Sequence, residues 1–374
     1  MKWLSLLLLL VSLASVLRAA DNQAYLAMFA ATRVTKMIGM ADMLKGVDEA
    51  MVEKMPGMAV MLGLPQREFI VRLWSPGIAP PTAAASLAPP AGLKLGARLD
   101  LSLFRPKAEP VEGPGAGPGT DAVPDFTIKR YWGSSPTVKP GQPEVVSWQG
   151  MTPEQKAAMR AQTAKSQAGR YFYKLDWTSG YWPADVMRAP VAKDAALQGL
   201  YTLTTNYTGR TALEVPETVN FLAPLEFTSP KLDAAPPLDK PLAFAWKPVP
   251  NVLGYLMLII GIKGKNTLIM WSSSEIAAGL DVEAEYLQMA TVRELVKTTA
   301  LMGPDRQDAT VPAGIFQDCD MVTLMMYGYG PGAATAEGQP LPRLQTKTTL
   351  NVILGGKMML KPGEMGGPVA GGAE

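Results

Sequence analysis

The sequence of 374 residues contains no histidine and only one cysteine, Cys319. Without an imidazole there can be no Ser-His-Asp triad, Cys-His dyad, HExxH zinc site or histidine general base. A single thiol also excludes an intramolecular disulfide and any metal cluster held by several thiolates. Any catalysis would therefore have to use carboxylate, Lys, Tyr, Ser or Thr chemistry.

The sequence also has no large excess of charge of either sign, since it contains 35 basic and 33 acidic residues. Lys2 and Arg18 lie in an N-terminal segment that we expect to be removed, which leaves the charges balanced. A neutral chain gives no electrostatic reason to expect nucleic acid or an anionic membrane surface as a partner. Its 35 glycines and 33 prolines favour a turn-rich protein built from strands.

Residues 1–19 have the features of a secretory signal peptide. Lys2 supplies the positive start, Leu4 to Val16 is a short apolar run, and Ala19 suits the cleavage site, with Ala20 as the neighbouring option. No second stretch of 18 apolar residues occurs, so we expect an exported protein with no membrane span in the mature chain. The expected location is the periplasm or the extracellular space.

Residues 24–63 are rich in methionine. A spacing of three and four residues predicts an amphipathic helix with a methionine face, ended by Pro56-Gly57. The residues on this face are Met37, Met40, Leu44, Val47, Met51 and Met55. Two MxxMxxM triplets also have the spacing of thioether clusters that hold Cu(I). They are Met37, Met40 and Met43, then Met55, Met58 and Met61. Since Ile38 and Leu44 accompany them, we favour packing in a core or against a partner, for which flexible methionine is suited.

Up to residue 218 the pattern predicts an irregular β-rich domain. We expect strands at 68–74, 93–103, 126–132, 145–148 and 200–207, from β-branched, aromatic or alternating residues. A Pro/Gly loop covers 106–124. One helix is expected from Thr152 to Gly169, with Thr152 and Gln155 forming a capping box around Pro153.

Residues 219–356 have the rhythm of a second β domain, followed by a Gly-rich tail at 357–374 that we expect to be disordered. The predicted strands are 221–227, 242–247, 255–262, 267–271, 309–316, 321–327 and 344–354. The strand at 255–262 is apolar on both faces, which is typical of a strand covered on each side. The turn at 263–266 predicts a hairpin with the strand that follows.

The stretch Trp246-Lys247-Pro248-Val249-Pro250-Asn251-Val252-Leu253-Gly254-Tyr255 resembles the B-to-C region of fibronectin type III sandwiches. In that family a strand-B tryptophan packs beside a strand-C tyrosine. Val311-Pro312-Ala313-Gly314 is similar to the family's E-to-F passage. The resemblance covers about 220–356, with a helix inserted at 275–302 that Thr291 and Glu294 would cap. It implies a spacer or a binding platform. The whole chain also resembles uncharacterised secreted proteins of Gram-negative bacteria.

An aromatic cluster lies between residues 171 and 182 and is bordered by Asp176 and Asp185. Its members are Tyr171, Tyr173, Trp177, Tyr181 and Trp182. Flat rings beside carboxylates could bind sugar, with Trp177, Tyr181, Trp182 and Asp185 as the contact residues. The competing interpretation is ordinary core packing in a β-rich region, which we favour.

Two carboxylates can hydrolyse a glycosidic bond without histidine. Asp176 with Asp185, or Asp318 with Asp320, are candidates by proximity alone, and a spacing of two is typical of a solvated strand face. Cys319 lies between two carboxylates that disfavour its thiolate, so we interpret it as a small structural residue. The GxGxG fragment at 328–332 follows a strand but opens no helix, which argues against a dinucleotide loop.

The sequence thus predicts a mainly β protein with two β-rich domains, the second an immunoglobulin- or fibronectin III-like sandwich with an inserted helix. Our leading hypothesis is an exported, non-enzymatic envelope or extracellular protein that needs no cofactor and acts by protein or glycan contact. The alternatives are a carbohydrate-active enzyme with paired carboxylates and a periplasmic Cu(I)-binding protein.

Overall fold

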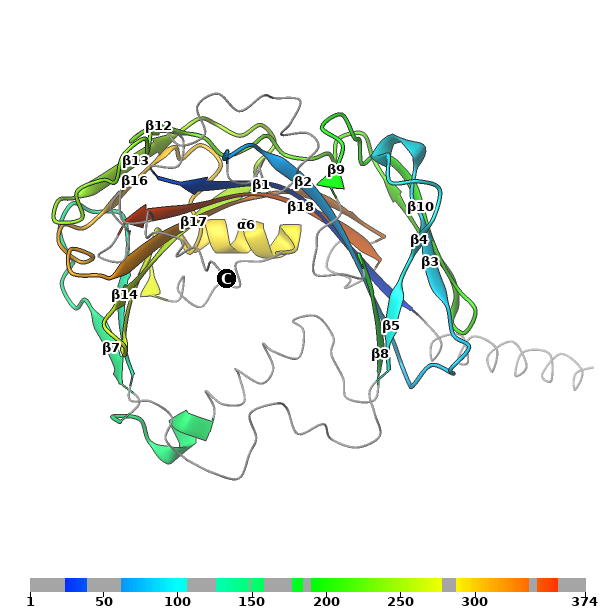
Figure 1. The fold of residues 1–374 in the computed structure, drawn as a ribbon, viewed down its shortest axis with the longest axis horizontal. Coiled ribbons are helices and arrows are strands. Elements are labelled where there is room, and N and C mark those ends of the chain that lie inside the picture. Colours follow the sequence, from blue (N-terminus) through cyan, green and yellow to red (C-terminus); the bar gives the residue numbers. More distant parts are fainter. Residues whose placement is uncertain are drawn as a thin grey trace, which may run out of the picture.

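The computed structural model describes residues 24–38, 62–105, 126–147, 149–157, 177–183, 190–277, 287–335 and 342–355. Strands dominate these residues, so the prediction of a mainly β protein is confirmed. The strands form one large sheet and two small ones (Figure 1).

The large sheet has eleven strands and curves into an arch (Figure 1). Its order is β5-β8-β2-β1-β18-β17-β14-β15-β6-β7, and β9 pairs with β2 beside this path. The strands of one half are β5 (Ser102–Phe104), β8 (Thr178–Trp182), β2 (Gln66–Ser75), β9 (Pro190–Val191) and β1 (Tyr25–Met37). Those of the other half are β18 (Arg343–Gly355), β17 (Met321–Ala334), β14 (Gly254–Lys263), β15 (Thr267–Ser272), β6 (Thr127–Trp132) and β7 (Glu144–Ser147).

Two small sheets lie against the outer, convex face of the arch (Figure 1). One contains β11 (Gly209–Val215), β10 (Gly199–Thr205), β3 (Ala85–Ala88) and β4 (Leu99–Asp100) in that order. The other contains β12 (Phe227–Ser229), β13 (Leu242–Trp246) and β16 (Asp308–Val311). The helices are the short 3₁₀ turn η1 (Ala91–Leu93) and α6 (Met289–Lys297), and α6 lies inside the arch.

The two ends of the described chain meet in the middle of the large sheet. Strand β1 pairs in parallel with β18 over eleven residue pairs, from Ala27 beside Arg343 to Met37 beside Ile353. On its other edge β1 pairs antiparallel with β2. The large sheet therefore draws its strands from both sides of residue 218, where the sequence predicts a domain boundary.

Residue alternation along β1 and β18 creates two different faces. Leu26, Met28 and Ala30 of β1 point to the convex side, where they join the core beneath the four-stranded sheet. Leu350 and Val352 of β18 join the core beneath the three-stranded sheet in the same way. Beneath the two small sheets the convex face is thus apolar and covered, as expected for a sheet face that packs against a second layer.

The concave face near β14 and β17 is covered by α6. Leu256 and Tyr329 pack against Val292 of the helix in a small separate cluster. Met257 and Ile259 of β14 instead face the convex core. The prediction that this strand is covered on both sides is confirmed.

Several local predictions are confirmed. Strands occur where we expected them at 68–74, 126–132, 145–148, 200–207, 242–247, 255–262, 321–327 and 344–354, with shifts at their ends. The strand expected at 309–316 ends at Val311, and a turn follows it. The hairpin of β14 and β15 is present. At the predicted helix start, Gln155 Oε1 accepts a hydrogen bond from the Thr152 backbone N (2.9 Å), and Thr152 Oγ1 accepts one from the Gln155 backbone N (3.3 Å).

Other local predictions are wrong. Residues 93–103 do not form one strand, because a left-handed Lys94 and Gly96 (φ +90°) turn the chain, and only the short β4 and the start of β5 remain. Residues 221–226 are irregular, since their apolar side chains anchor a connection between the small sheets rather than a ladder. The inserted helix exists, but Gln288 occupies its N-cap position without a side-chain hydrogen bond, and Thr291 lies inside the helix.

The predicted methionine helix mostly lies outside the described residues. Met37, its first member, is the last residue of strand β1 and is 41% exposed. Four predicted segments also lie outside the described residues: the signal peptide, the loop at 106–124, the tail at 357–374 and most of the helix that begins at Thr152. The same holds for a set of candidate site residues, namely Met40, Met43, Met55, Met58, Met61, Tyr171, Tyr173, Asp176 and Asp185.

Trp246 and Tyr255 pack edge to face, with ring centroids 5.6 Å apart. The Tyr255 hydroxyl also accepts a hydrogen bond from the backbone N of Val249 (3.1 Å). This is the tryptophan–tyrosine contact that the fibronectin resemblance implies for these positions. Membership of that family stays a prediction.

The GxGxG fragment lies inside strand β17, where each glycine makes room for a neighbour. A Cβ at Gly328 would approach the Thr348 side chain to 2.9 Å, and one at Gly330 would approach Leu222 to 2.9 Å. A Cβ at Gly332 would collide with the backbone carbonyl oxygen of Leu344, beside a register shift between β17 and β18. The glycines therefore serve close packing, and the prediction that they form no dinucleotide loop agrees with this position.

Gly332→Ala should lower the free energy of unfolding by about 1–3 kcal/mol, because the obstructing atom is backbone and cannot rotate away. Gly303→Ala is the matched control, since the nearest atom to its Cβ would lie at 3.8 Å. Urea denaturation of both variants measures the effect. Equal stability of the two would contradict the packing role.

Candidate functional site

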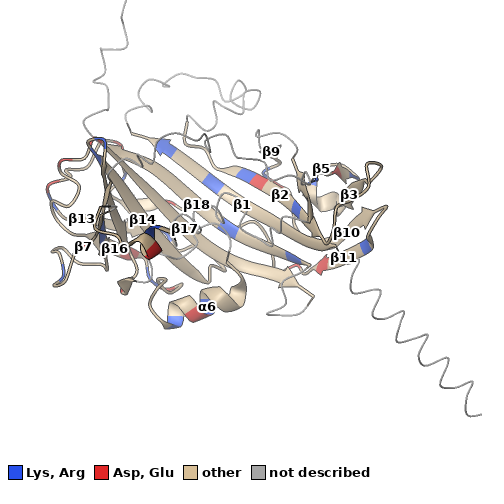
Figure 2. Ribbon diagram, turned by 90° about the horizontal axis from the view of Figure 1, so that it is seen from below, with Lys and Arg blue, Asp and Glu red and all other residues tan. Residues whose placement is uncertain are grey.

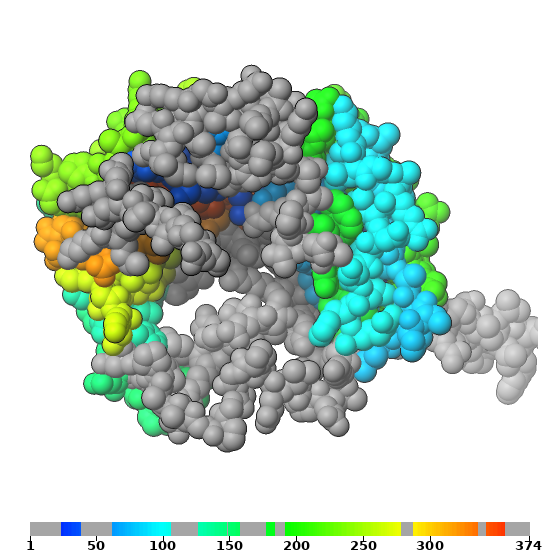
Figure 3. Space-filling view, in the orientation of Figure 1, coloured from blue at the N-terminus to red at the C-terminus, as the bar shows by residue number. Residues whose placement is uncertain are grey.

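The concave face of β1, β2 and β18 carries charged and polar side chains beside an apolar cluster that includes Ala27, Phe29 and Trp74. We call the following residues the concave band: Arg33, Glu68, Arg343, Gln345, Lys347 and Thr349. They share one face because Ala27 of β1 pairs with Arg343, Ala31 pairs with both Lys347 and Glu68, and alternate residues of a strand point the same way. In the space-filling view only small parts of β1 (blue) and β18 (red) are visible in the middle of the arch (Figure 3).

The β18 side chains of the concave band are almost completely buried. Arg343 and Thr349 are 2% exposed, and Gln345 and Lys347 are 5% exposed. Within the described part of the chain, neither amide atom of Gln345 nor the hydroxyl of Thr349 has a hydrogen-bond partner. Burying a polar group without a partner costs free energy, so such groups call for an explanation.

Arg33 and Glu68 form an ion pair within the band. Their Nε and Oε1 atoms lie 3.1 Å apart, and the two side chains are 26% and 6% exposed. They come from neighbouring strands, with Arg33 opposite Gln66 and Glu68 opposite Ala31, so the contact is diagonal across the ladder. This pair neutralises the carboxylate of the band and fixes the direction of the Arg33 guanidinium.

Lys347 lies beside two tyrosines of β17. Its ammonium is 5.8 Å from the centroid of the Tyr327 ring. The Tyr327 and Tyr329 rings are stacked, with centroids 6.4 Å apart and an angle of 14° between their planes. An ammonium over an aromatic face is held by the negative charge of that face. The band therefore ends in an aromatic wall on the side of α6.

A second aromatic group borders the band near β2 and β8. Trp177 stacks on Tyr25 with ring centroids 5.3 Å apart, next to the buried Trp74. The Arg72 guanidinium lies 5.6 Å from the centroid of the Tyr181 ring. The group thus combines a cation with several rings on the concave face.

The structure separates the residues that we predicted as a sugar platform. Tyr181 contacts Arg72 on the concave face, and Trp177 stacks on Tyr25 there. Trp182, the next residue after Tyr181, points to the opposite face and packs against the core beneath the four-stranded sheet. Trp177 and Trp182 therefore do not form one flat surface.

The charges on the concave face are unequal. Of the described residues on this face of β1, β2 and β18, four are cations and one is a carboxylate, namely Arg33, Arg72, Arg343, Lys347 and Glu68. Figure 2 shows basic residues along the strands in the middle of the sheet. Since the chain as a whole is nearly neutral, this face is a local concentration of positive charge.

Asp318 and Asp320 have structural contacts. Asp318 Oδ2 lies 2.9 Å from the Lys263 ammonium, and this hydrogen bond raises the pKa of Lys263. Asp320 Oδ2 accepts a hydrogen bond from the backbone N of Gly264 (2.6 Å). The two aspartates thus tie the β14–β15 turn to the start of β17. Cys319 between them is buried, and its sulfur fills the space beside Gly261.

No group of three or more Cys, Asp or Glu side chains among the described residues is arranged to hold a metal ion. In the same part of the chain, no helix is long and apolar enough to cross a membrane. A scan of protein-family models and a search of curated protein sequences return no match for this chain.

The sequence contains the alternating pattern that places part of the concave band on one face of β18, but only the apolar residues of this pattern entered the strand prediction. Leu344, Leu350 and Val352 predicted the strand, but the alternate positions Arg343, Gln345 and Lys347 were assigned to no site. Polar residues on one face of a strand ordinarily face water. Their burial follows from the position of β18 in the middle of the sheet, between β1 and β17, which one strand pattern alone does not specify.

A double-mutant cycle on Arg33→Met and Glu68→Gln should give a coupling energy of about 1–3 kcal/mol, because the pair is largely shielded from water. Urea denaturation of the two single variants and the double variant gives this energy. The same cycle on Arg98 and Asp100, whose side chains are 65% and 72% exposed, is the control and should give less than about 1 kcal/mol. Equal coupling in the two pairs would show that the concave band is as solvated as the outer surface.

Proposed function

We propose that this is an exported, non-enzymatic binding protein of the bacterial envelope or extracellular space, and that its concave band contacts an acidic polypeptide segment. The mature protein acts in the periplasm or outside the cell, and its function is contact rather than chemistry. The supporting observation is the concentration of four cations and one carboxylate on the concave face of three adjacent strands.

The geometry of the cations supports an extended ligand. Arg343 and Lys347 are four residues apart on β18, a distance of about 13 Å along a strand at 3.3 Å per residue. Arg72 extends the row across β1 towards β8, since Arg343 and Arg72 both pair with Ala27. A chain with several carboxylates can contact such a row at more than one point. The amide of Gln345, between Arg343 and Lys347, offers a donor and an acceptor to a peptide backbone.

The rings of the concave face support a peptide over a sugar. Tyr181 has Arg72 against its ring, Tyr327 has Lys347, and Trp177 has Tyr25. Sugar platforms use open, coplanar rings, whereas these rings are engaged by neighbours and lie at different places. Cations held on rings in this way remain able to pair with carboxylates.

The carboxylates support a non-enzymatic function. Glu68 is paired with Arg33, and the candidate pair Asp318 and Asp320 is engaged with Lys263 and the backbone of Gly264. Glycoside hydrolysis needs two carboxylates that face each other across a bond. Each of these three carboxylates instead has a structural contact with a cation or a backbone N–H.

The proposal predicts that fluorescently labelled poly-L-glutamate binds the full-length protein and is released as salt increases. Arg72→Gln and Lys347→Gln should each weaken binding about 5-fold, since each removes one charge-assisted contact. Fluorescence anisotropy measures the affinity. Arg98→Gln is the control, because Arg98 is exposed and paired with Asp100 away from the band, and it should leave the affinity unchanged.

Polygalacturonate serves as the comparison ligand, since it is an acidic polysaccharide. Stronger binding of polygalacturonate, with the same loss in Arg72→Gln, would replace the peptide with a glycan. Equal affinity of all variants, or no binding of either polymer, would overturn the role of the concave band.

A further inference from the structure

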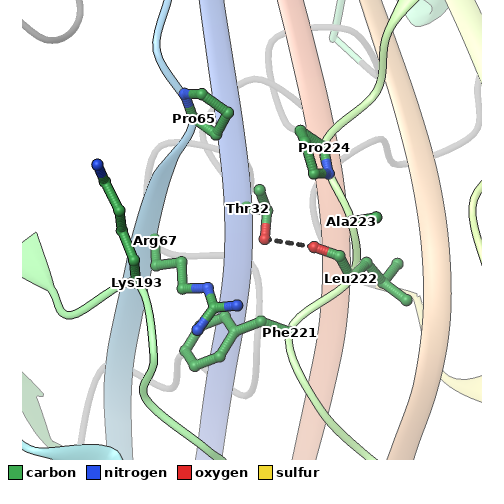
Figure 4. A pocket seen from close by; sticks show the side chains of 8 residues that line it. All are labelled: Thr32, Pro65, Arg67, Lys193, Phe221, Leu222, Ala223 and Pro224. Carbon is green, nitrogen blue, oxygen red and sulfur yellow. Dashed lines mark hydrogen bonds between the residues drawn. The ribbon is translucent and has the colours of Figure 1, made fainter.

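A second site lies on the convex side of the sheet, between the two small sheets. Residues 216–226 connect β11 to β12 and cross the outer face of the arch there. A cavity of about 540 Å³ opens beside this crossing segment. It is bordered by Thr32, Pro65, Arg67, Lys193, Phe221 and Pro224 among others (Figure 4). Its volume is within the range of small-molecule sites.

The crossing segment is firmly attached to the sheet, so the cavity has a fixed wall. Phe221 belongs to the core beneath the four-stranded sheet, and Leu222 belongs to the core beneath the three-stranded sheet. Thr32 Oγ1 donates a hydrogen bond to the Leu222 carbonyl oxygen (2.7 Å) on the floor of the cavity. Because both neighbouring side chains are anchored, the backbone between β11 and β12 is held at this point.

Arg67 supplies a positioned cation at the base of the cavity. Its guanidinium lies over the Phe221 ring at 4.8 Å from the centroid, and its Nη1 donates a hydrogen bond to the Ala195 carbonyl oxygen (2.9 Å). Burial lowers the pKa of Arg67, while the nearby Asp194 carboxylate acts in the opposite direction. Arginine nevertheless remains charged, so the cost of its burial would be offset by an anion in the cavity.

Lys193 adds a second cation at the mouth of the cavity. The neighbouring carboxylate, Asp194, is bonded to Lys94, which also lowers the Asp194 pKa. No carboxylate lines the cavity among the described residues, whereas Arg67 and Lys193 both do. The charge inside the cavity is therefore positive.

The remaining walls are apolar and flat. Pro65 and Pro224 lie on opposite sides of the cavity, and Phe221 lies below Arg67 (Figure 4). We propose that this cavity binds a small organic anion with a planar apolar body, of the chemical class of aromatic carboxylates. The carboxylate pairs with Arg67 and Lys193, and the planar body packs between the two prolines.

This site is independent of the concave band. Thr32 and Arg67 pair with each other across β1 and β2 and point outwards, whereas their sequence neighbours Arg33 and Glu68 point inwards. A ligand in the cavity therefore touches none of the residues of the band. Variants of one site can serve as controls for the other.

The test is a titration of the full-length protein with 2-naphthoate, in which isothermal titration calorimetry measures the affinity. 2-Naphthylmethanol, which has the same rings without the charge, is the matched ligand. We expect the carboxylate to bind more tightly than the alcohol. Arg67→Gln should weaken binding at least about 10-fold and Lys193→Gln about 3-fold, because a buried pairing group contributes more than an exposed one.

Two further variants locate the ligand. Ala223→Trp fills the cavity without removing a cation and should abolish binding, while Lys240→Gln changes an exposed lysine elsewhere and should not affect it. Lys193 and Ala223 are exposed, so these substitutions leave the core intact even if Arg67→Gln disturbs Phe221. Equal binding of the carboxylate and the alcohol, unchanged affinity in Lys193→Gln and Ala223→Trp, or loss of binding in Arg72→Gln would each overturn the proposal.

Discussion

The parallel pairing of β1 with β18 is the contact on which the rest of the structure depends. It joins the first described strand to the last, with more than 300 residues between them, so the middle of the sheet is complete only when both ends of the chain are in place. Parallel neighbours cannot be joined by a tight turn, and long closures are slow and entropically costly. This entropic cost is offset by the burial of both faces of β1, where the residues from Leu26 to Ala31 have exposed fractions of 3% or less. The regions on either side of residue 218 therefore share this one sheet.

The same pairing separates the chemistry of the two faces. Because side chains alternate along a strand, Leu344 and Leu350 join the convex cores while Arg343, Gln345 and Lys347 gather on the concave side. A slip of one residue between β1 and β18 would point the cations of β18 towards the apolar cores and its leucines towards the concave side. The cost of such a slip is large enough to fix the register. The polar band and the packed cores therefore specify each other, and both candidate sites derive from one alignment of strands.

The sequence predicted individual strands well wherever the pattern was local. The apolar run of β14, the hairpin to β15 and the capping box at Thr152 and Gln155 each depend on residues close together in the chain. The prediction was poor where contacts between residues that are distant in sequence determine the local structure. Met37 matched a helical spacing but pairs with Ile353 in a strand, and residues 221–226 carried strand-like side chains that anchor a crossing segment instead. The positions of the candidate site residues also depend on such distant contacts. Trp177, Tyr181 and Trp182 are neighbours in sequence but divide between two faces, whereas Arg33, Glu68 and Lys347 are distant in sequence and meet on one.

The absence of histidine now has a structural counterpart. The cations of the concave face are Arg and Lys, which stay charged across the physiological pH range, and two of them rest on tyrosine rings. An imidazole in such a place would change its charge near neutral pH and turn attraction for an anion into a pH-dependent switch. Arg67 lies on the convex side of β2 and Arg72 on its concave side, so one strand presents permanent positive charge to both sides of the sheet. Permanent charge that is held by rings and backbone carbonyls is suited to retaining an anion, and unsuited to the proton transfers of hydrolysis. The residue types and their placement thus support the proposed binding function.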